Sequence, residues 1–254
     1  MIPRRNPFPA DRFARLIDWL YPPRCRACRE RIRGSDSEYF CVPCRGRIRL
    51  IQPPLCTICG RPFPDASGGD HRCGACLARP PRFSRARAWA CYPREETDRA
   101  PLREVLHRFK YGRKIALGKP LGRLMALGCA GFLAQYASDL IVPVPLHPRR
   151  LRWRGFNQSV VLARQVSRVY AVPLDPFALR RVKETPPQTQ LSEEERRRNV
   201  RGAFAVREGA ELEGRRVLLI DDVYTSGATV NECARALLRA GAEEVCVLTL
   251  ARTV

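Results

Sequence analysis

Apolar residues in the last two thirds of the chain follow two spacings, one typical of helices and one of buried strands. Helical spacing predicts helices over Leu102–Tyr111, Ser159–Tyr170 and Thr229–Ala240. Short apolar runs predict strands over Leu140–Pro145, Ala203–Val206, Arg216–Ile220 and Glu244–Leu250. This alternation of strands and helices favours an α/β fold with a parallel sheet and crossover helices. In such a fold, ligands bind at the carboxyl ends of the strands.

The first part of the chain lacks this alternation. Apolar residues at helical spacing between Asp11 and Leu20 predict one short helix, which the Pro22-Pro23 pair ends. Cysteine pairs follow as far as Cys76, and a proline-rich segment comes after them. We therefore divide the chain into an N-terminal helix (residues 1–24), a cysteine-rich module (25–81) and the α/β domain (82–254).

Eight of the 12 cysteines form four Cys-x-x-Cys pairs, separated by gaps of 12, 11 and 13 residues. Each pair directs two thiolates at one tetrahedral metal, so two pairs complete a closed zinc site. The spacing predicts two structural Zn²⁺ ions, with the metal ligands Cys25, Cys28, Cys41, Cys44, Cys56, Cys59, Cys73 and Cys76. Sequential pairing gives the first two pairs one ion, and an interleaved pairing is also compatible with the spacing. Disulfides are the alternative, and His71 is interpreted as a surface residue rather than a further ligand.

The chain is strongly basic. Lysine and arginine outnumber the acids by 46 to 25, which gives a formal net charge of +21. Two zinc tetrathiolates, each with a net charge of about −2, lower this to about +17. Such a surface attracts nucleic acid, nucleotides or phosphorylated metabolites, because neutralised phosphates release their condensed counterions. A solvated basic surface without a ligand is the alternative.

The apolar stretches are short. None reaches the roughly 20 residues that a bilayer span requires. No apolar core follows the basic residues near Met1, as a secretory signal would need. We therefore expect no membrane insertion and a cytoplasmic location, where thiols stay reduced.

The most specific chemistry in the chain lies in the segment Val217–Thr229. An apolar strand ends in Asp221 and Asp222, a loop rich in Thr, Ser and Gly follows, and then a helix begins. Hydroxyls, backbone N–H groups and the positive end of the helix dipole converge there and suit a phosphate monoester. Gly227 permits close approach of the backbone. Two acids beside this loop make sense if the phosphate carries a sugar whose hydroxyls need acceptors; an ordinary helix cap is the alternative.

This segment resembles the phosphoribosyl pyrophosphate (PRPP) signature of type I phosphoribosyltransferases. The resemblance implies that Asp221 and Asp222 are catalytic residues that bind the ribose hydroxyls. It implies a 5′-phosphate site formed by Thr225, Ser226, Gly227, Ala228 and Thr229. It places pyrophosphate at the loop after the first core strand, which here contains Pro145, Leu146, His147 and Arg149. The implied metal is Mg²⁺, held mostly by oxygens of PRPP and by water.

The whole chain, from about Leu16 to Arg252, resembles the ComF family of competence-associated proteins. Besides the cysteine pairs and the Asp221–Thr229 loop, the matching motifs are His107–Tyr111, Val142–Pro145, Arg154–Gln158, Thr189–Ser192, Arg196 and Asn199. The resemblance implies a type I phosphoribosyltransferase-like parallel sheet flanked by helices, with an N-terminal double zinc ribbon.

The resemblance also implies a function in DNA uptake during natural transformation. The implied partners are PRPP, single-stranded DNA and other competence proteins. The alternative is an active PRPP-dependent phosphoribosyltransferase that acts on an unknown metabolic acceptor. Lys183–Asn199 is interpreted as a hood over PRPP or as an exposed loop. Trp19, Trp89 and Trp153 are interpreted as core residues or as platforms for base stacking.

Overall fold

The computed structural model describes residues 22–32, 39–65, 67–93, 100–185 and 192–254. The predicted N-terminal helix and Trp19 lie outside these residues, as do Thr189, Gln190 and Leu191. Within the described residues, no helix is both long enough and apolar enough to span a membrane.

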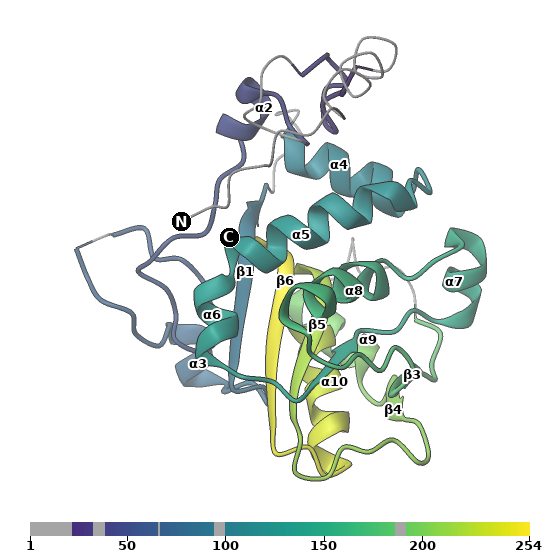
Figure 1. Cartoon of the computed structure of the whole chain (residues 1–254). Helices are drawn as coiled ribbons and strands as arrows, with labels where there is room; N and C mark the ends of the chain where they lie inside the picture. Colours follow the sequence, from purple (N-terminus) through teal and green to yellow (C-terminus); the bar gives the residue numbers. More distant parts are fainter. Residues whose placement is uncertain (1–21, 33–38, 66, 94–99, 186–191) are drawn as a thin grey trace.

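A four-stranded parallel sheet forms the centre of the protein, with the strand order β1-β6-β5-β2. Its strands are β1 Arg85–Tyr92, β6 Glu244–Thr253, β5 Arg216–Tyr224 and β2 Leu140–Pro143. Figure 1 shows β1, β6 and β5 side by side. Strands β2, β5 and β6 confirm predicted strands. β5 continues beyond its apolar run because Asp221 still pairs with Thr249 on β6. Both acids therefore lie within the last part of a sheet strand.

Strand β1 does not follow from the apolar pattern. Arg85 and Arg87 alternate with alanines, which are weak strand formers. The register pairs Ala86 with Val247 on the long, buried strand β6. Pairing with that neighbour therefore overrides the weak local preference.

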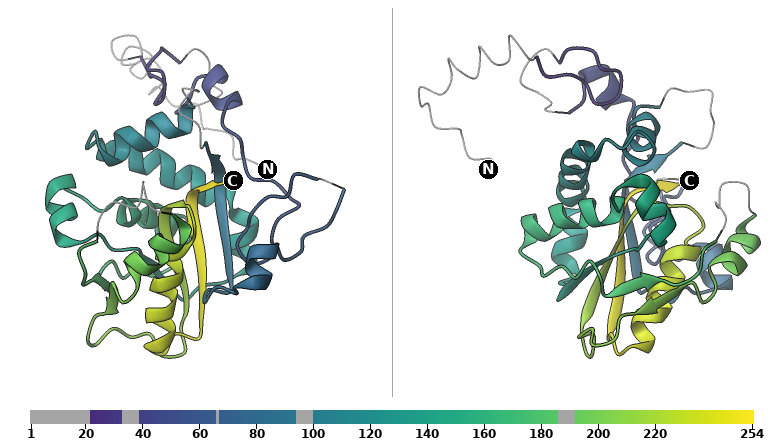
Figure 2. Two further views of the ribbon diagram at one scale, coloured as in Figure 1. Left: turned by 180° about the vertical axis from the view of Figure 1, so that it is seen from behind. Right: turned by 90° about the vertical axis from the view of Figure 1, so that its right-hand side faces the viewer.

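Helices cover both faces of the sheet (Figure 2). On one face lie α4 Pro101–Lys110, α5 Gly118–Gly128 and α8 Gln158–Tyr170. On the other lies α10 Ala228–Arg239, with α9 Glu193–Val200 beside it. Strand β5 serves both cores, because successive side chains of a strand point to opposite faces. Leu218 and Ile220 join the first core, and Leu219 joins the second.

The three predicted helices are confirmed as α4, α8 and α10. Shorter elements complete the chain: α2 Val42–Gly46, α3 Gly74–Ala78, η1 Ile115–Leu117, α6 Ala130–Gln135 and α7 Pro148–Arg154. The predicted strand at Ala203–Val206 appears as β4 Phe204–Val206, which pairs antiparallel with β3 Leu179–Arg181 outside the main sheet. Helix α9 occupies the end of the segment interpreted as a hood, and Ser192 and Glu195 form a capping box at its start.

The cysteine-rich module consists of two lobes, the first containing residues 25–44 and the second residues 56–76, and both contact the edge strand β1. The backbone N–H of Ile51, after the first lobe, donates to the Trp89 carbonyl at 3.1 Å. The N–H of Ala86 donates to the carbonyl of Ile58 in the second lobe at 2.6 Å. Cysteines of the first lobe belong to the core under α4 and α5, and those of the second belong to the core under α10. Trp89 is buried in the first core, so it stabilises the fold and offers no surface for base stacking.

Candidate functional site

The eight paired cysteines form two clusters of four. Cys25, Cys28, Cys41 and Cys44 make one, and Cys56, Cys59, Cys73 and Cys76 make the other. Within each cluster the sulfur atoms all lie within 4.8 Å of one another. The pairing along the chain is therefore sequential, and the interleaved alternative is wrong.

The sulfur separations fit tetrahedral zinc. The Sγ atoms of Cys28 and Cys41 are 3.6 Å apart, and those of Cys59 and Cys73 are 3.7 Å apart. A Zn–S bond of about 2.3 Å gives an S–S separation of about 3.8 Å in a tetrahedron, whereas a disulfide needs about 2.05 Å. All four positions of each site are taken by sulfur, so the zinc ions stabilise the fold and leave no open position for substrate.

In the second cluster, backbone N–H groups donate hydrogen bonds to a cysteine sulfur and stabilise its thiolate form, which binds metal. The N–H groups of Cys73 and Cys59 donate to Cys56 Sγ at 3.3 Å and 3.5 Å. Burial raises the pKa of the Cys56 thiol, but these backbone hydrogen bonds outweigh it and lower the pKa to about 6. His71 is exposed and stacks on Phe63 with ring centroids 3.9 Å apart. It is therefore a surface residue, as expected.

The predicted phosphate loop lies between the end of β5 and the start of α10. Gly227 is the N-cap of α10 and has a φ of +77°, a left-handed conformation that favours glycine. A Cβ atom at this position would collide with the Tyr224 ring and its hydroxyl. Ser226 Oγ accepts a hydrogen bond from the N–H of Ala228 at 3.4 Å. The loop therefore presents hydroxyls at the amino end of a helix, as phosphate binding requires.

Asp221 and Asp222 are buried beside this loop, with exposed fractions of 9% and 4%. Asp221 Oδ1 accepts hydrogen bonds from Ser159 Oγ at 3.0 Å and from the N–H of Asp222 at 2.9 Å. Burial raises the pKa of Asp221 to about 7, and the charge of Asp222 adds to the rise. Burial and the charge of Asp222 together therefore favour the neutral form of Asp221.

Asp222 has a cation beside it that the sequence analysis did not assign. Lys110 Nζ, at the end of α4, lies 3.0 Å from Asp222 Oδ1. Burial lowers the pKa of Lys110, but the charge and hydrogen bond of Asp222 outweigh it and raise the pKa. The other carboxylate oxygen, Asp222 Oδ2, is buried and lacks a hydrogen-bond partner among the described residues. Buried polar atoms are seldom left without a partner, so Oδ2 is a natural acceptor for a ligand hydroxyl.

Arg154 is a second cation near the acids. It is buried, donates to Gln158 Oε1 at 2.6 Å and lies 5.4 Å from the centre of the Tyr111 ring. Burial lowers the pKa of Arg154, and the charge of Asp222 opposes that shift. Lys110 and Arg154 both belong to motifs quoted above, His107–Tyr111 and Arg154–Gln158. Those motifs are therefore the signal in the sequence that points to these two residues.

The predicted pyrophosphate loop connects β2 to α7. His147 is the N-cap of α7, and its Nδ1 accepts from the N–H of Arg149 at 3.4 Å. The Arg149 guanidinium pairs with Glu184 at 2.6 Å, and both side chains are exposed. Asn157 holds this loop against α8: its side chain caps Ser159 at 2.9 Å and donates to the Val144 carbonyl at 3.0 Å. Trp153, on α7, is half exposed, with Arg113 6.0 Å from its ring centre.

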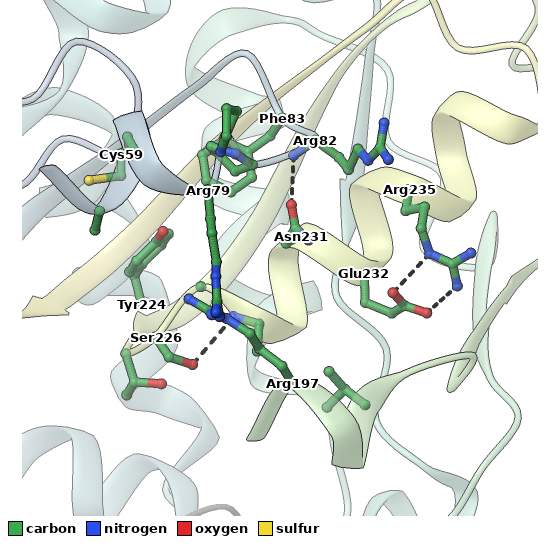
Figure 3. Close-up of a pocket in the computed structure, with 18 of the residues that line it drawn as sticks. Cys59, Arg79, Arg82, Phe83, Arg197, Tyr224, Ser226, Asn231, Glu232 and Arg235 are labelled. Atoms are coloured by element: carbon green, nitrogen blue, oxygen red, sulfur yellow. Dashed lines mark hydrogen bonds and ion pairs between the residues drawn. The ribbon is translucent and has the colours of Figure 1, made fainter. Parts of the chain in front are cut away.

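A cavity of about 680 Å³ opens on the other side of the phosphate loop (Figure 3). Thr225, Ser226, Gly227 and Ala228 form part of its wall, and Cys59, Cys73 and Cys76 of the second cluster form another part. Arginines contribute much of the rest, namely Arg79, Arg82, Arg197, Arg201, Arg235 and Arg239. The two aspartates do not line this cavity. The phosphate loop thus has Asp221 and Asp222 on one side and the arginine-lined cavity on the other.

Two family models match the chain. The model of the double zinc ribbon domain matches residues 16–77, and that of the phosphoribosyl transferase domain matches residues 157–253. With the two four-cysteine clusters and the parallel sheet, they define a zinc-ribbon protein with a phosphoribosyltransferase-type domain.

Named relatives then identify the family. Competence protein F of Haemophilus influenzae is 32% identical over 228 residues, which are 84% of this chain and 97% of that protein. The DNA utilization protein YhgH of Escherichia coli K12 is 36% identical over 217 residues, 84% of this chain and 90% of that protein. Competence protein ComFC of Bacillus subtilis is 28% identical over 86% of both chains. The chain belongs to the ComF family.

Solved structures overlap with only part of the chain. The allosteric regulatory enzyme of purine biosynthesis is 25% identical over 52% of this chain and 25% of its own, with a TM-score of 0.34. A purine phosphoribosyltransferase from Pyrococcus horikoshii is 18% identical over 52% of this chain and 73% of its own, with a TM-score of 0.35. The fold assignment rests on the family models and the sheet rather than on these overlaps.

Proposed function

We propose that this protein binds PRPP with Mg²⁺ at the end of β5 and handles single-stranded DNA during DNA uptake. The observation that carries the PRPP assignment is the buried Asp222 Oδ2, which has no hydrogen-bond partner within the described part of the chain, next to a helix N-cap loop rich in hydroxyls. Asp222 lies only a few residues before the loop that can hold a phosphate. One ligand that carries both hydroxyls and a phosphate would therefore contact both.

Each part of PRPP has proposed contacts at this end of the sheet. Asp222 Oδ2 and Asp221 accept hydrogen bonds from the ribose hydroxyls, while Lys110 keeps its ion pair with Asp222 Oδ1. The backbone and hydroxyls of Thr225–Thr229 bind the 5′-phosphate. Pyrophosphate lies toward Pro145–Arg149, the loop that follows β2, and β2 is the direct neighbour of β5. Mg²⁺ would be held there mostly by pyrophosphate oxygens and water, and it would neutralise part of their charge.

The DNA assignment is supported by relatives and by charge. The printed names of the relatives refer to competence and to DNA utilization. The net charge of +21 provides the electrostatic attraction that phosphate backbones require. The proposed partners are a single DNA strand and other competence proteins, on the cytoplasmic side of the membrane.

Calorimetric titration with PRPP and Mg²⁺ tests the ligand. We expect saturable binding to the unchanged protein and loss of binding in an Asp221→Asn/Asp222→Asn variant. Asp175→Asn is the matched control, because Asp175 forms an exposed ion pair with Arg207 at 3.2 Å, away from the loop. Equal affinity in all three proteins would refute the assigned site.

The second candidate is an active phosphoribosyltransferase for an unknown metabolic acceptor. The pKa of Asp221, about 7, favours it, because a group that titrates near neutral pH can accept a proton from a nucleophile. The bond between ribose C1 and pyrophosphate breaks, pyrophosphate leaves with the electron pair, and C1 bonds to the acceptor, which loses a proton. Release of pyrophosphate that depends on an added acceptor would support this activity, and binding of PRPP without its consumption would exclude it.

A further inference from the structure

We propose that the basic cavity between the second four-cysteine cluster and α10 holds the phosphate backbone of single-stranded DNA. The inference rests on the proposed DNA function and assigns that function to a particular surface. The cavity is distinct from the acid pair of the proposed PRPP site, because neither aspartate lines it, although Thr225, Ser226, Gly227 and Ala228 of the proposed 5′-phosphate loop do.

Most of the charge of the cavity comes from three separate segments of the chain, and Arg61 of the second lobe and Arg252 of β6 add to it. The linker after the second cluster provides Arg79 and Arg82, the end of α9 provides Arg197 and Arg201, and α10 provides Arg235 and Arg239. Arg79 and Arg197 extend into the cavity in Figure 3. Cations spread over several walls match a chain of phosphates better than one compact anion, since each phosphate meets its own guanidinium.

The negative charges that line the cavity do not cancel the positive charge of its arginines. Among the described residues, Glu232 is the one acid that lines the cavity, and it is paired with Arg235 through a hydrogen bond of 2.9 Å. Cys59, Cys73 and Cys76 also line it, and their zinc tetrathiolate carries a net charge of about −2. Arg252, which donates to the Cys59 carbonyl, lies beside that cluster. Eight lining arginines, less one for Glu232 and two for the zinc site, leave about +5.

The size of the cavity favours a single strand. Its volume of about 680 Å³ lies within the roughly 300–1,000 Å³ typical of small-molecule sites, so it accommodates a short segment of one strand. A duplex cannot enter such a space. The aromatic rings that line it, Phe83 and Tyr224, are buried at 2% and 8% exposure, so they offer no platform for stacked bases. Binding is therefore to the backbone, without sequence preference and with strong dependence on salt.

The experiment compares two double variants that remove the same charge. Arg79→Gln/Arg201→Gln removes two cavity arginines from different walls, and both residues are exposed. Arg164→Gln/Arg168→Gln removes two exposed arginines of α8, which packs on the other face of the sheet. Fluorescence anisotropy measures binding of the zinc-loaded full chain to a thymidine 20-mer, with a 20-base-pair duplex as a second probe. Zinc content and thermal melting verify that each variant folds.

We expect the cavity variant to bind the 20-mer at least about tenfold more weakly. The slope of log K against log salt should fall by about 1.4, since each phosphate contact contributes about 0.7 for a single strand. The α8 variant should remain within about twofold of the unchanged protein. Equal losses in both variants, or tighter binding of the duplex than of the 20-mer, would overturn the cavity assignment and leave the DNA function standing. Absence of 20-mer binding by the unchanged protein at about 50 mM salt would instead refute the DNA function itself.

Discussion

Lys110 Nζ lies 3.0 Å from Asp222 Oδ1 and thereby joins the end of α4 to the strand that carries the phosphate loop. The two residues are 112 positions apart in the sequence, and their side chains are 20% and 6% exposed. The ion pair fixes one oxygen of the carboxylate, and the other has no hydrogen-bond partner among the residues that the structure describes. The orientation of the acid that we assign to ribose therefore depends on a residue from another part of the chain.

Removal of Lys110 should destabilise the fold more than removal of the whole pair. Lys110→Met leaves a buried carboxylate without its cation, which costs about 3 kcal/mol. Lys110→Met/Asp222→Asn removes both charges and should cost less. Urea unfolding of the single and double variants measures the difference. Equal free energies of unfolding for Lys110→Met and the unchanged protein would contradict a buried ion pair.

The folding stability should fall as the pH rises toward 7. The pKa of Asp221 is raised to about 7 in the folded protein, whereas an unfolded aspartate has a pKa of about 3.9. Between these values the folded state binds more protons than the unfolded state, so a rise in pH favours unfolding. We expect the free energy of unfolding, measured in excess zinc from pH 6 upward, to decrease until about pH 7 and then to level off. Asp221→Asn should lack this decrease, and the same slope in both proteins would count against a raised pKa.

Gly227→Ala should impair both the loop and PRPP binding. Alanine in a left-handed conformation costs about 1–2 kcal/mol, and its Cβ would also collide with Tyr224. Gly209 has a similar φ of +72°, but a Cβ there meets no atom of the described residues within 4 Å, so Gly209→Ala isolates the backbone cost. Thermal melting should rank Gly227→Ala as the less stable variant, and calorimetry should detect a loss of PRPP affinity in it alone. Equal melting temperatures would contradict the described packing of the loop.

Each four-cysteine cluster should bind one zinc ion independently. The unchanged chain should contain two zinc ions, and Cys59→Ser or Cys28→Ser should each reduce this to one. Cys59→Ser should destabilise the protein more, because its cluster is buried throughout, whereas Cys28 is exposed. Metal analysis and thermal melting of both variants provide the measurement. Two retained zinc ions in either variant would be inconsistent with the four-cysteine ligand sets.

PRPP and a DNA strand should weaken the binding of each other. Ser226 and Gly227 belong to the predicted 5′-phosphate loop and also line the basic cavity, so two negatively charged ligands would meet there. Because the coupling is reciprocal, PRPP should lower the affinity for the 20-mer by the same factor by which the 20-mer lowers that for PRPP. Anisotropy titrations with and without PRPP measure one side of the cycle, and calorimetry measures the other. Unchanged affinities in both directions would indicate that the two sites do not share the loop.

The local pattern was sufficient to predict the elements that carry the chemistry. The apolar run before Asp221 and the helix after Gly227 have strong local signals, and both are present as β5 and α10. The cysteine spacing likewise predicted two zinc sites. Strand β1 was missed because its alanines and arginines form a strand only beside β6. Lys110 lies in the motif His107–Tyr111, but its contact with Asp222, like that of Ser159 with Asp221, depends on how α4 and α8 pack on the sheet. The cavity depends on four segments, within 59–83, 197–201, 224–239 and 252–253, that meet only in the folded chain.

A crystal structure with PRPP and Mg²⁺ tests the central claim most directly. We predict that the ribose hydroxyls lie within hydrogen-bond distance of Asp222 Oδ2 and Asp221, with the 5′-phosphate on the backbone N–H groups of the Ser226–Thr229 loop. Lys110 should still contact the other oxygen of Asp222. PRPP bound elsewhere, or a loop that stays empty at saturating PRPP, would contradict the account.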